Sequence, residues 1–520
     1  MSPAAAVLDS VQTHASVERV LMRDCSRSRS AGLAWGFAIG GVVATGFSCA
    51  PAPTDAMGPR LELTPCQLTS PGSPLSLAAE CGHLSVPEDR DAANGRSIDL
   101  RVAVVRAVSR APWPDPLFFL TGGPGQAATE SFVTIHSAFR RVRRDRDIVL
   151  VDQRGTGGSN PLRCPAGDAS DVWLLDDEDI EPWVEKCLDS LEGDPRFYTT
   201  SIAMRDLDDV RRALGHERIN LYGVSYGTRA ALTYLRLYPD RVRSIVLDGV
   251  VPPTETLGID IARDAERALD LMIDRCSADP SCAKAFPNIG IAIDEVMARL
   301  DVPVPVSLRH PRTGEIVSVE LDRRMAAYAI RLLSYSQETV ATVPLLLASA
   351  RENDLAPLAA QFLMTVGGVS ETMSDAMGIS IICSEDYPFF EDELIAERTR
   401  DTYLGALQTD ALKLVCPSWP RGKVPQDFRA PLKSSVPVLL LSGEADPVTP
   451  PENAEIARRQ LDRSLHVVAP GQGHVVIHRG CISSLASEFV ESASFDGIDT
   501  SCVERIVPRA FFTSFAGPLP

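Results

Sequence analysis

Short apolar runs alternate with amphipathic stretches in two separate parts of the chain. In the first part, apolar or alternating runs predict strands at 98–107, 116–121, 148–151, 219–222 and 244–247. Apolar residues at helical spacing predict helices at 127–142, 201–214 and 228–237. Strands that alternate with helices along a chain form a mostly parallel sheet with helices on both faces. This part of the sequence therefore predicts an α/β fold.

The alternation stops after residue 251 and resumes near residue 431. Residues 252–430 are mainly helical in pattern and irregular in spacing, with cysteines in their loops. Strand and helix patterns then return at 436–441, 451–461, 465–468 and 482–490. A sheet that is interrupted and later completed indicates an insertion. We predict one core domain from 76–251 and 431–520, and a large, mainly helical cap from 252–430.

The first 49 residues have the pattern of an export signal. Basic residues between 23 and 29 precede an uncharged apolar run over 31–48, and small residues and Cys49 follow. This order predicts a signal peptide or a lipoprotein signal over 1–49, which would start more naturally at Met22 than at Met1. A lipid on Cys49, or an uncleaved apolar anchor, would each attach the protein to a membrane. Residues 50–75 are rich in Pro, Ser and Thr and predict a linker.

The cysteines also indicate an exported protein. Of 12 cysteines, ten remain when Cys25 and Cys49 are set aside, and they fall into sequence neighbours. Nearest-neighbour pairing is the simplest prediction: Cys66–Cys81, Cys164–Cys187, Cys276–Cys282, Cys383–Cys416 and Cys481–Cys502. An even number of cysteines in an exported chain favours disulfides, in a secreted, periplasmic or envelope-attached protein. The alternative, a zinc site, lacks C-x-x-C pairs and interleaved histidines.

Composition excludes some classes of partner. The 520 residues are 45% hydrophobic and 23% charged, which is ordinary for a globular protein with a sizeable core. The net charge is −18, whereas binding to nucleic acid needs clustered Lys and Arg. We therefore expect no nucleic-acid partner.

A serine nucleophile is indicated at residue 225. The segment 223–227 (GVSYG) lies between a predicted strand and a predicted helix. Such a turn holds its serine in a strained conformation at the carboxyl end of the strand, and the flanking glycines allow close approach of the neighbouring backbone. The motif is common by chance, but its position between strand and helix makes Ser225 the predicted nucleophile.

A serine hydroxyl needs a base, and the base needs an acid that orients it. In α/β-hydrolases the order along the chain is serine, acid, histidine. Asp446 follows a late predicted strand, with Glu444 as the alternative acid; His474 follows the last predicted strand, with His478 as the alternative base. These positions predict an α/β-hydrolase fold.

Two backbone amides are expected to stabilise the oxyanion. One is that of Tyr226, directly after the nucleophile, and the other is that of Gly123, in the turn after an early strand. This acyl-transfer chemistry requires no metal or cofactor. Asp152, Arg154 and Asp248 are predicted to be structural.

Three motifs together resemble the prolyl aminopeptidase group. They are 122–125 (GGPG), 152–157 (DQRGTG) and 223–227 (GVSYG). The long cap, the late cysteines and 446–450 (DPVTP) resemble the exported branch of that group, the tripeptidyl aminopeptidases. The resemblance covers roughly residues 80–505. Thr121 departs from it, since prolyl aminopeptidases often have His there, which places the narrow prolyl specificity in question.

The resemblance implies an exopeptidase that removes one to a few residues from peptides with a free N-terminus. Such an enzyme needs an anion for the substrate ammonium, and Glu385 with Asp386 in the cap matches the family's acidic segment. A solvated or ion-paired acid is the alternative for Glu385. Two other functions remain open: an esterase or lipase with the same triad, and a non-catalytic binding protein on a hydrolase scaffold.

Overall fold

The computed structural model describes residues 61–92, 94–165 and 175–517. The predicted signal, its apolar run and Cys49 lie outside these residues. Within the described part, no helix combines the length and the apolar character that crossing a bilayer requires.

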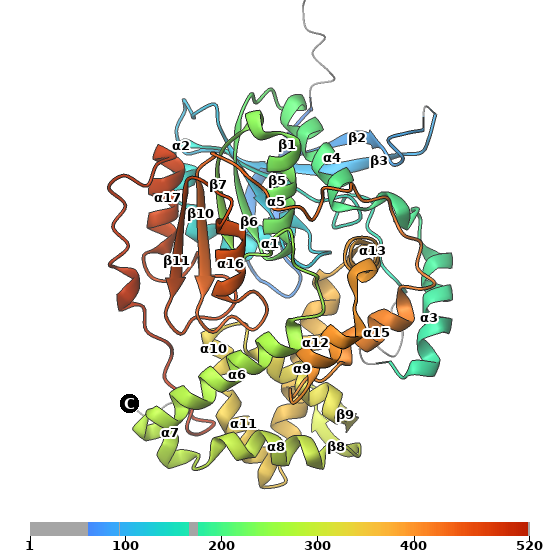
Figure 1. Cartoon of the computed structure of the whole chain (residues 1–520), viewed down its shortest axis with the longest axis vertical. Helices are drawn as coiled ribbons and strands as arrows, with labels where there is room; N and C mark the ends of the chain where they lie inside the picture. Colours follow the sequence, from blue (N-terminus) through green and yellow to red (C-terminus); the bar gives the residue numbers. More distant parts are fainter. Residues whose placement is uncertain (1–60, 93, 166–174, 518–520) are drawn as a thin grey trace, which may run out of the picture. The chain divides into compact units, whose positions relative to one another are not determined.

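The strands of the core form one nine-stranded sheet in the order β1-β2-β3-β5-β4-β6-β7-β10-β11. Their bounds are β1 (Thr64–Thr69), β2 (Ser76–Pro87), β3 (Ser97–Val105), β4 (Leu117–Leu120), β5 (Ile148–Val151), β6 (Ile219–Val224), β7 (Val242–Asp248), β10 (Val438–Gly443) and β11 (Ser464–Ala469). The six strands from β5 to β11 pair in parallel. The late strands β10 and β11, red in Figure 1, complete the sheet beside β7, as the resumed alternation in the sequence predicts.

Three strands at the other edge are antiparallel. Strand β1 lies within residues 50–75, so the prediction of a linker there is wrong for Thr64–Thr69. The Pro-, Ser- and Thr-rich composition concealed this strand, most of whose residues are exposed because β1 ends the sheet. Pairing with β2, together with the Cys66–Cys81 disulfide, holds it in place.

Helices cover both faces of the sheet because alternate strand residues point to opposite sides. Leu100, Phe118 and Leu221 pack on the face covered by α4, α5 and α16, whereas Phe119 and Tyr222 pack on the face covered by α1 and α17. The helices of the two core segments of the chain are α1 (Ala128–Ile135), α2 (Val142–Asp145), α3 (Asp177–Ser190), α4 (Thr200–Ala213), α5 (Tyr226–Leu237), α16 (Pro451–Arg458) and α17 (Ile482–Ser492). Of these, α3 packs against α13 and α15 of the insertion rather than on the sheet. The single helix predicted over 127–142 is divided, since a 3-10 turn at His136–Phe139 follows α1.

Between β7 and β10 the chain forms ten helices and a two-stranded sheet. They are α6 (Ile261–Ala278), α7 (Pro280–Ala285), α8 (Ile289–Arg299), β8 (Val304–Arg309), β9 (Ile316–Leu321), α9 (Arg323–Leu333), α10 (Gln337–Val340), α11 (Val343–Arg351), α12 (Ala356–Thr372), α13 (Asp375–Glu385), α14 (Asp392–Thr399) and α15 (Leu407–Val415). Most of them surround a separate apolar cluster that includes Leu269, Ile330 and Leu358. The interruption predicted from the sequence is therefore a helical insertion with its own core.

All five predicted disulfide pairs are confirmed: Cys66–Cys81, Cys164–Cys187, Cys276–Cys282, Cys383–Cys416 and Cys481–Cys502. The zinc alternative for these ten cysteines is therefore wrong. Disulfides form and persist in oxidising compartments, so this set fits an exported protein.

Candidate active site

Ser225 occupies the turn between β6 and α5 with φ 55° and ψ −126°. A residue with a side chain rarely adopts this conformation, and the bond from the Ser225 N–H to the Asp248 carbonyl (2.9 Å) helps to hold it. Neither Gly223 nor Gly227, the two glycines around Ser225, has room for a side chain. A Cβ on Gly223 would lie 2.4 Å from the Gly227 carbonyl oxygen, and one on Gly227 would lie 2.2 Å from that of Leu120.

Asp446 and His474 form a hydrogen-bonded pair. The Asp446 Oδ2 atom lies 2.8 Å from His474 Nδ1, and both side chains are almost fully buried. The Asp446 carboxylate also accepts bonds from the Val448 and Thr449 amides (2.9 Å each) and from the Thr449 hydroxyl (2.8 Å). These donors orient the carboxylate toward the ring, which leaves His474 Nε2 as the nitrogen able to take a proton.

The pair favours its charged form. Burial would raise the pKa of Asp446, but the charge and hydrogen bond of His474 outweigh it, and the pKa is lowered. Burial would lower the pKa of His474, but Asp446, with a smaller contribution from Asp248, raises it. A protonated His474 is therefore stabilised in place.

The alternative acid and base lie elsewhere. Glu444 is exposed, and its carboxylate accepts a bond from the Gly471 amide (2.7 Å). His478 lines a different hollow beside the Cys481–Cys502 disulfide, together with Arg479. Of the candidates from the sequence, the structure joins Asp446 to His474.

Ser225 and His474 line the same cavity, which has a volume of about 880 Å³. The core contributes Gly122 and Gly123 to its wall, and the insertion contributes residues from α9, α12 and α13 and the segments that flank them. Although the two residues are 249 positions apart in sequence, each therefore reaches one shared space between core and insertion.

Of the two predicted oxyanion donors, Gly123 lines this cavity and Tyr226 directly follows the cavity-lining Ser225. Tyr226 is the first residue of α5, so its amide has no carbonyl partner within the helix. Gly123 lines the cavity, and a Cβ on the adjacent Gly122 would lie 3.0 Å from the Ser225 Cβ atom. The 122–125 turn therefore packs directly against the serine.

Two family models match the chain. The model described as alpha/beta hydrolase fold matches residues 115–279, which include Ser225, and the model described as TAP-like protein matches residues 402–502, which include Asp446 and His474. Together with the sheet order and the serine turn, these matches decide the fold. The chain is an α/β-hydrolase.

Two relatives align with this α/β-hydrolase over most of its length. Serine protease Hip1 of Mycobacterium tuberculosis is 25% identical over an alignment of 471 positions that covers 84% of this chain and 89% of that protein. Tripeptidyl aminopeptidase of Streptomyces coelicolor is 25% identical over an alignment of 468 positions that covers 83% of this chain and 84% of that protein. The resemblance predicted from the motifs is confirmed.

Glu385 and Asp386, the predicted substrate-binding acids of this hydrolase, are fully buried and have internal partners. Glu385 accepts bonds from the Thr200 amide (2.6 Å) and hydroxyl (2.8 Å), and Asp386 pairs with Arg229 (3.0 Å). Burial raises the pKa of Glu385 to about 7. Neither acid is among the residues that line the cavity, so the structure does not bring them to Ser225. The Thr200 hydroxyl links Glu385 to the Tyr226 hydroxyl (2.7 Å), directly behind the serine turn.

Asp248 supports the histidine loop of the hydrolase. Its buried carboxylate accepts bonds from the amides of Val476 (2.9 Å) and Ile477 (2.8 Å) and from the Tyr222 hydroxyl (2.8 Å). The structural role predicted for it holds. Thr449 was missed, although the 446–450 segment places a hydroxyl three residues after the acid, within reach of its carboxylate.

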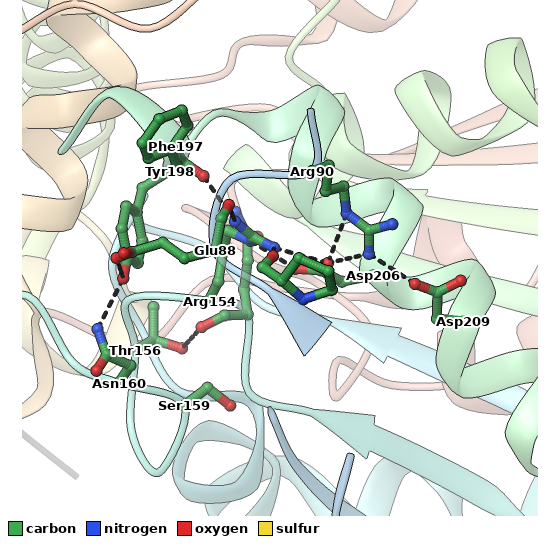
Figure 2. Close-up of polar contacts among 12 residues, drawn as sticks. Glu88, Arg90, Arg154, Thr156, Ser159, Asn160, Phe197, Tyr198, Asp206 and Asp209 are labelled. Carbon is green, nitrogen blue, oxygen red and sulfur yellow. Dashed lines mark hydrogen bonds and ion pairs between the residues drawn. The ribbon is translucent and has the colours of Figure 1, made fainter. Parts of the chain in front are cut away.

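Arg154 is likewise structural. Figure 2 shows its guanidinium between Asp206 and the backbone near Glu88. It donates to Asp206 (2.6 and 2.8 Å) and to the carbonyls of Glu88 (2.7 Å) and Phe197 (2.9 Å), while fully buried. Asp152 binds the Thr129 amide at the start of α1 (2.8 Å). Both residues of the 152–157 motif brace the turn beside the site.

Proposed function

We propose that this hydrolase is a serine exopeptidase that cleaves peptides near a free N-terminus. The observation that carries the proposal is the shared cavity, in which Ser225 and the Asp446–His474 pair meet residues of the insertion. The two relatives, one a serine protease and one a tripeptidyl aminopeptidase, support peptides as the substrate class.

The proposed reaction is acyl transfer. His474 takes the Ser225 proton as the hydroxyl attacks the scissile carbonyl, and Asp446 stabilises the imidazolium. The amides of Tyr226 and Gly123 hold the oxyanion. The leaving amine takes the proton from His474, and water then repeats the sequence on the acyl-enzyme. No step calls for a metal or cofactor.

Recognition of a free N-terminus needs an anion inside the cavity, and we propose Asp375 for that role. Its Oδ1 atom accepts bonds from the amides of Cys164 and Ala376 (2.9 Å each), and the positive charge of Arg163, which lines the same cavity, favours its ionised form. Asp375 lines the cavity, whereas Glu385 lies behind Tyr226. We therefore place the substrate ammonium at Asp375, with Glu385 and Asp386 supporting that wall.

Asp375 lies on the side of the cavity near the oxyanion turn. The preceding residue, Ser374, donates its amide to the Gly125 carbonyl (2.9 Å). Arg331 also lines the cavity and donates to the hydroxyl of Tyr335, whose ring lies edge-on to His474. The acyl part of the substrate would then extend toward Asp375, and the leaving part toward His474, its proton donor.

The test compares one peptide with a free N-terminus and its N-acetylated form. The wild-type enzyme should cleave the free peptide, with at least about a tenfold loss of kcat/KM on acetylation, because a charge-assisted contact is worth about 1.5–3 kcal/mol. Asp375→Asn should remove most of this preference, and Ser225→Ala should abolish turnover without unfolding.

Each alternative function predicts a different result. An esterase would hydrolyse acyl esters well and show no preference for a free ammonium. A non-catalytic binding protein would not be labelled at Ser225 by a fluorophosphonate. Equal loss on both peptides in Asp375→Asn would exclude this residue as the ammonium site.

A further inference from the structure

The helical insertion contacts the catalytic acid directly through Arg267, in the second turn of α6. Its Nη1 atom donates to the Glu444 carbonyl (2.9 Å), and its Nη2 atom donates to the Asp446 carbonyl (3.2 Å). One planar guanidinium therefore bridges two carbonyls of the loop that follows β10. Arginine suits this task because its donors form a rigid fork.

The same loop is also held by hydrogen bonds within the core. The amides of Glu444 and Ala445 donate to Ala469 (3.1 Å) and Gln472 (2.8 Å), which ties the acid loop to the loop that carries His474. These bonds fix the two loops to each other. The contact with Arg267 fixes the acid loop to the insertion.

The insertion also contacts the base. The His474 amide donates to the Tyr335 carbonyl (2.9 Å), and the Tyr335 ring lies edge-on to the imidazole with centroids 5.1 Å apart. A Cβ on Gly473 would lie 2.6 Å from the same carbonyl oxygen, so this close approach requires glycine. The two loops of the pair are therefore both held from the insertion, by α6 and by the segment after α9.

We propose that Arg267 is a positioning residue that holds the Asp446 loop in place relative to His474. Full activation of Ser225 then requires that the insertion is packed against this loop. This inference rests on the proposed acyl-transfer function. Arg267 does not line the catalytic cavity, and it acts through the loop backbone alone.

Loss of this support has a defined effect on the pH dependence. The groups that face the imidazole are Asp446 from its loop, Asp248 at the end of β7, and Arg331 and Tyr335 from the insertion. Asp446 raises the pKa of His474 most strongly among them. If the acid loop shifts, the pKa of His474 falls, and the acid limb of activity moves to lower pH. A variant that is only less stable would lose amplitude without moving this limb.

The experiment measures fluorophosphonate labelling and peptide turnover of Arg267→Met across pH. We expect kcat and the labelling rate to fall at least about tenfold, with KM within about threefold, because sub-ångström misplacement of catalytic groups costs rate rather than binding. The acid limb should move to lower pH. Arg267→Lys keeps the charge but cannot bridge both carbonyls, so its kcat and labelling rate should lie between those of the wild type and of Arg267→Met.

The matched control is Arg299→Met. Arg299 also lies on an insertion helix and donates to a backbone carbonyl, that of Ala350 (3.1 Å), away from the acid loop. It should label at the wild-type rate. Folding of each variant is checked by circular dichroism, and if Arg267→Met does not fold, Arg267→Lys carries the test. A folded Arg267 variant with the wild-type rate and acid limb overturns the proposal, whereas absence of labelling in the wild type would instead refute the proposed function.

Discussion

The hydrogen bond between Asp446 and His474 sets how the activity of the enzyme depends on pH. Since the pKa of His474 is raised and the base acts in its neutral form, activity falls as pH drops through a value above the ordinary histidine value of about 6.5. The same buried carboxylate that raises the pKa of His474 also stabilises the imidazolium in the transition state.

We predict that Asp446→Asn lowers kcat by about 10³- to 10⁴-fold and moves the acid limb of kcat/KM to lower pH. The neutral amide neither stabilises the imidazolium nor selects the reactive tautomer. The measurement is kcat/KM from pH 5 to 9, with His478→Gln as a control that should match the wild type. A wild-type limb at or below pH 6.5, or full activity in Asp446→Asn, would contradict the assigned pair.

Among the elements, helix α13 connects the wall of the cavity to an apolar cluster shared with the core, which includes Tyr198 and Tyr226. Asp375 is its first residue and Glu385 its last, so one helix carries both the proposed ammonium site and the buried acid behind Tyr226. The Cys383–Cys416 disulfide joins its last turn to the end of α15. The placement of Asp375 therefore depends on how firmly α13 is held.

We predict that replacing Cys383 and Cys416 by Ser lowers the free energy of unfolding by about 3–4 kcal/mol. The reason is that the unfolded chain gains entropy when the cross-link, which spans a sequence separation of 33 residues, is removed. The KM for free peptides should rise more than kcat falls, because the ammonium site moves while the triad stays. Denaturant unfolding and steady-state kinetics test this. The Cys276–Cys282 pair, whose residues do not line the cavity, is the control and should leave KM unchanged.

At the scale of the whole molecule, buried carboxyls make stability depend on pH. Burial raises the pKa of Glu385 to about 7, that of Asp248 to about 6 and that of Glu255 to about 8. Each is protonated more readily in the folded than in the unfolded chain. Their contribution to stability is complete below the unfolded pKa and is lost as pH rises through the folded pKa. The fold should therefore weaken from mildly acidic to alkaline pH.

We predict that Glu385→Gln reduces this dependence, because the amide stays neutral in the window between about pH 4.5 and 7 where Glu385 releases its proton on unfolding. The measurement is Tm of both proteins from pH 4.5 to 8.5. The wild type should lose more Tm than the variant across this range. Parallel curves would show that Glu385 does not couple folding to protonation.

Much of the core and of the triad follows from local sequence. The spacing of apolar residues predicts the parallel strands, because side-chain direction repeats with a fixed period within each element. The order of Ser225, Asp446 and His474 predicts the site, because each follows the carboxyl end of a strand in one parallel sheet. The even set of cysteines predicts the disulfides, which join near neighbours in sequence.

Other features depend on how distant segments meet, and no local pattern encodes them. That Asp375 lines the cavity and Glu385 does not depends on the packing of α13 against Tyr226 and Thr200. The hydrogen bonds of Arg267 join it to Glu444 and Asp446, which lie 177 and 179 positions further along the sequence. The sequence determines the type of each side chain and the face of the helix or strand on which it lies. Which residue it contacts, and how far it is exposed, depend on how the folded insertion packs against the core.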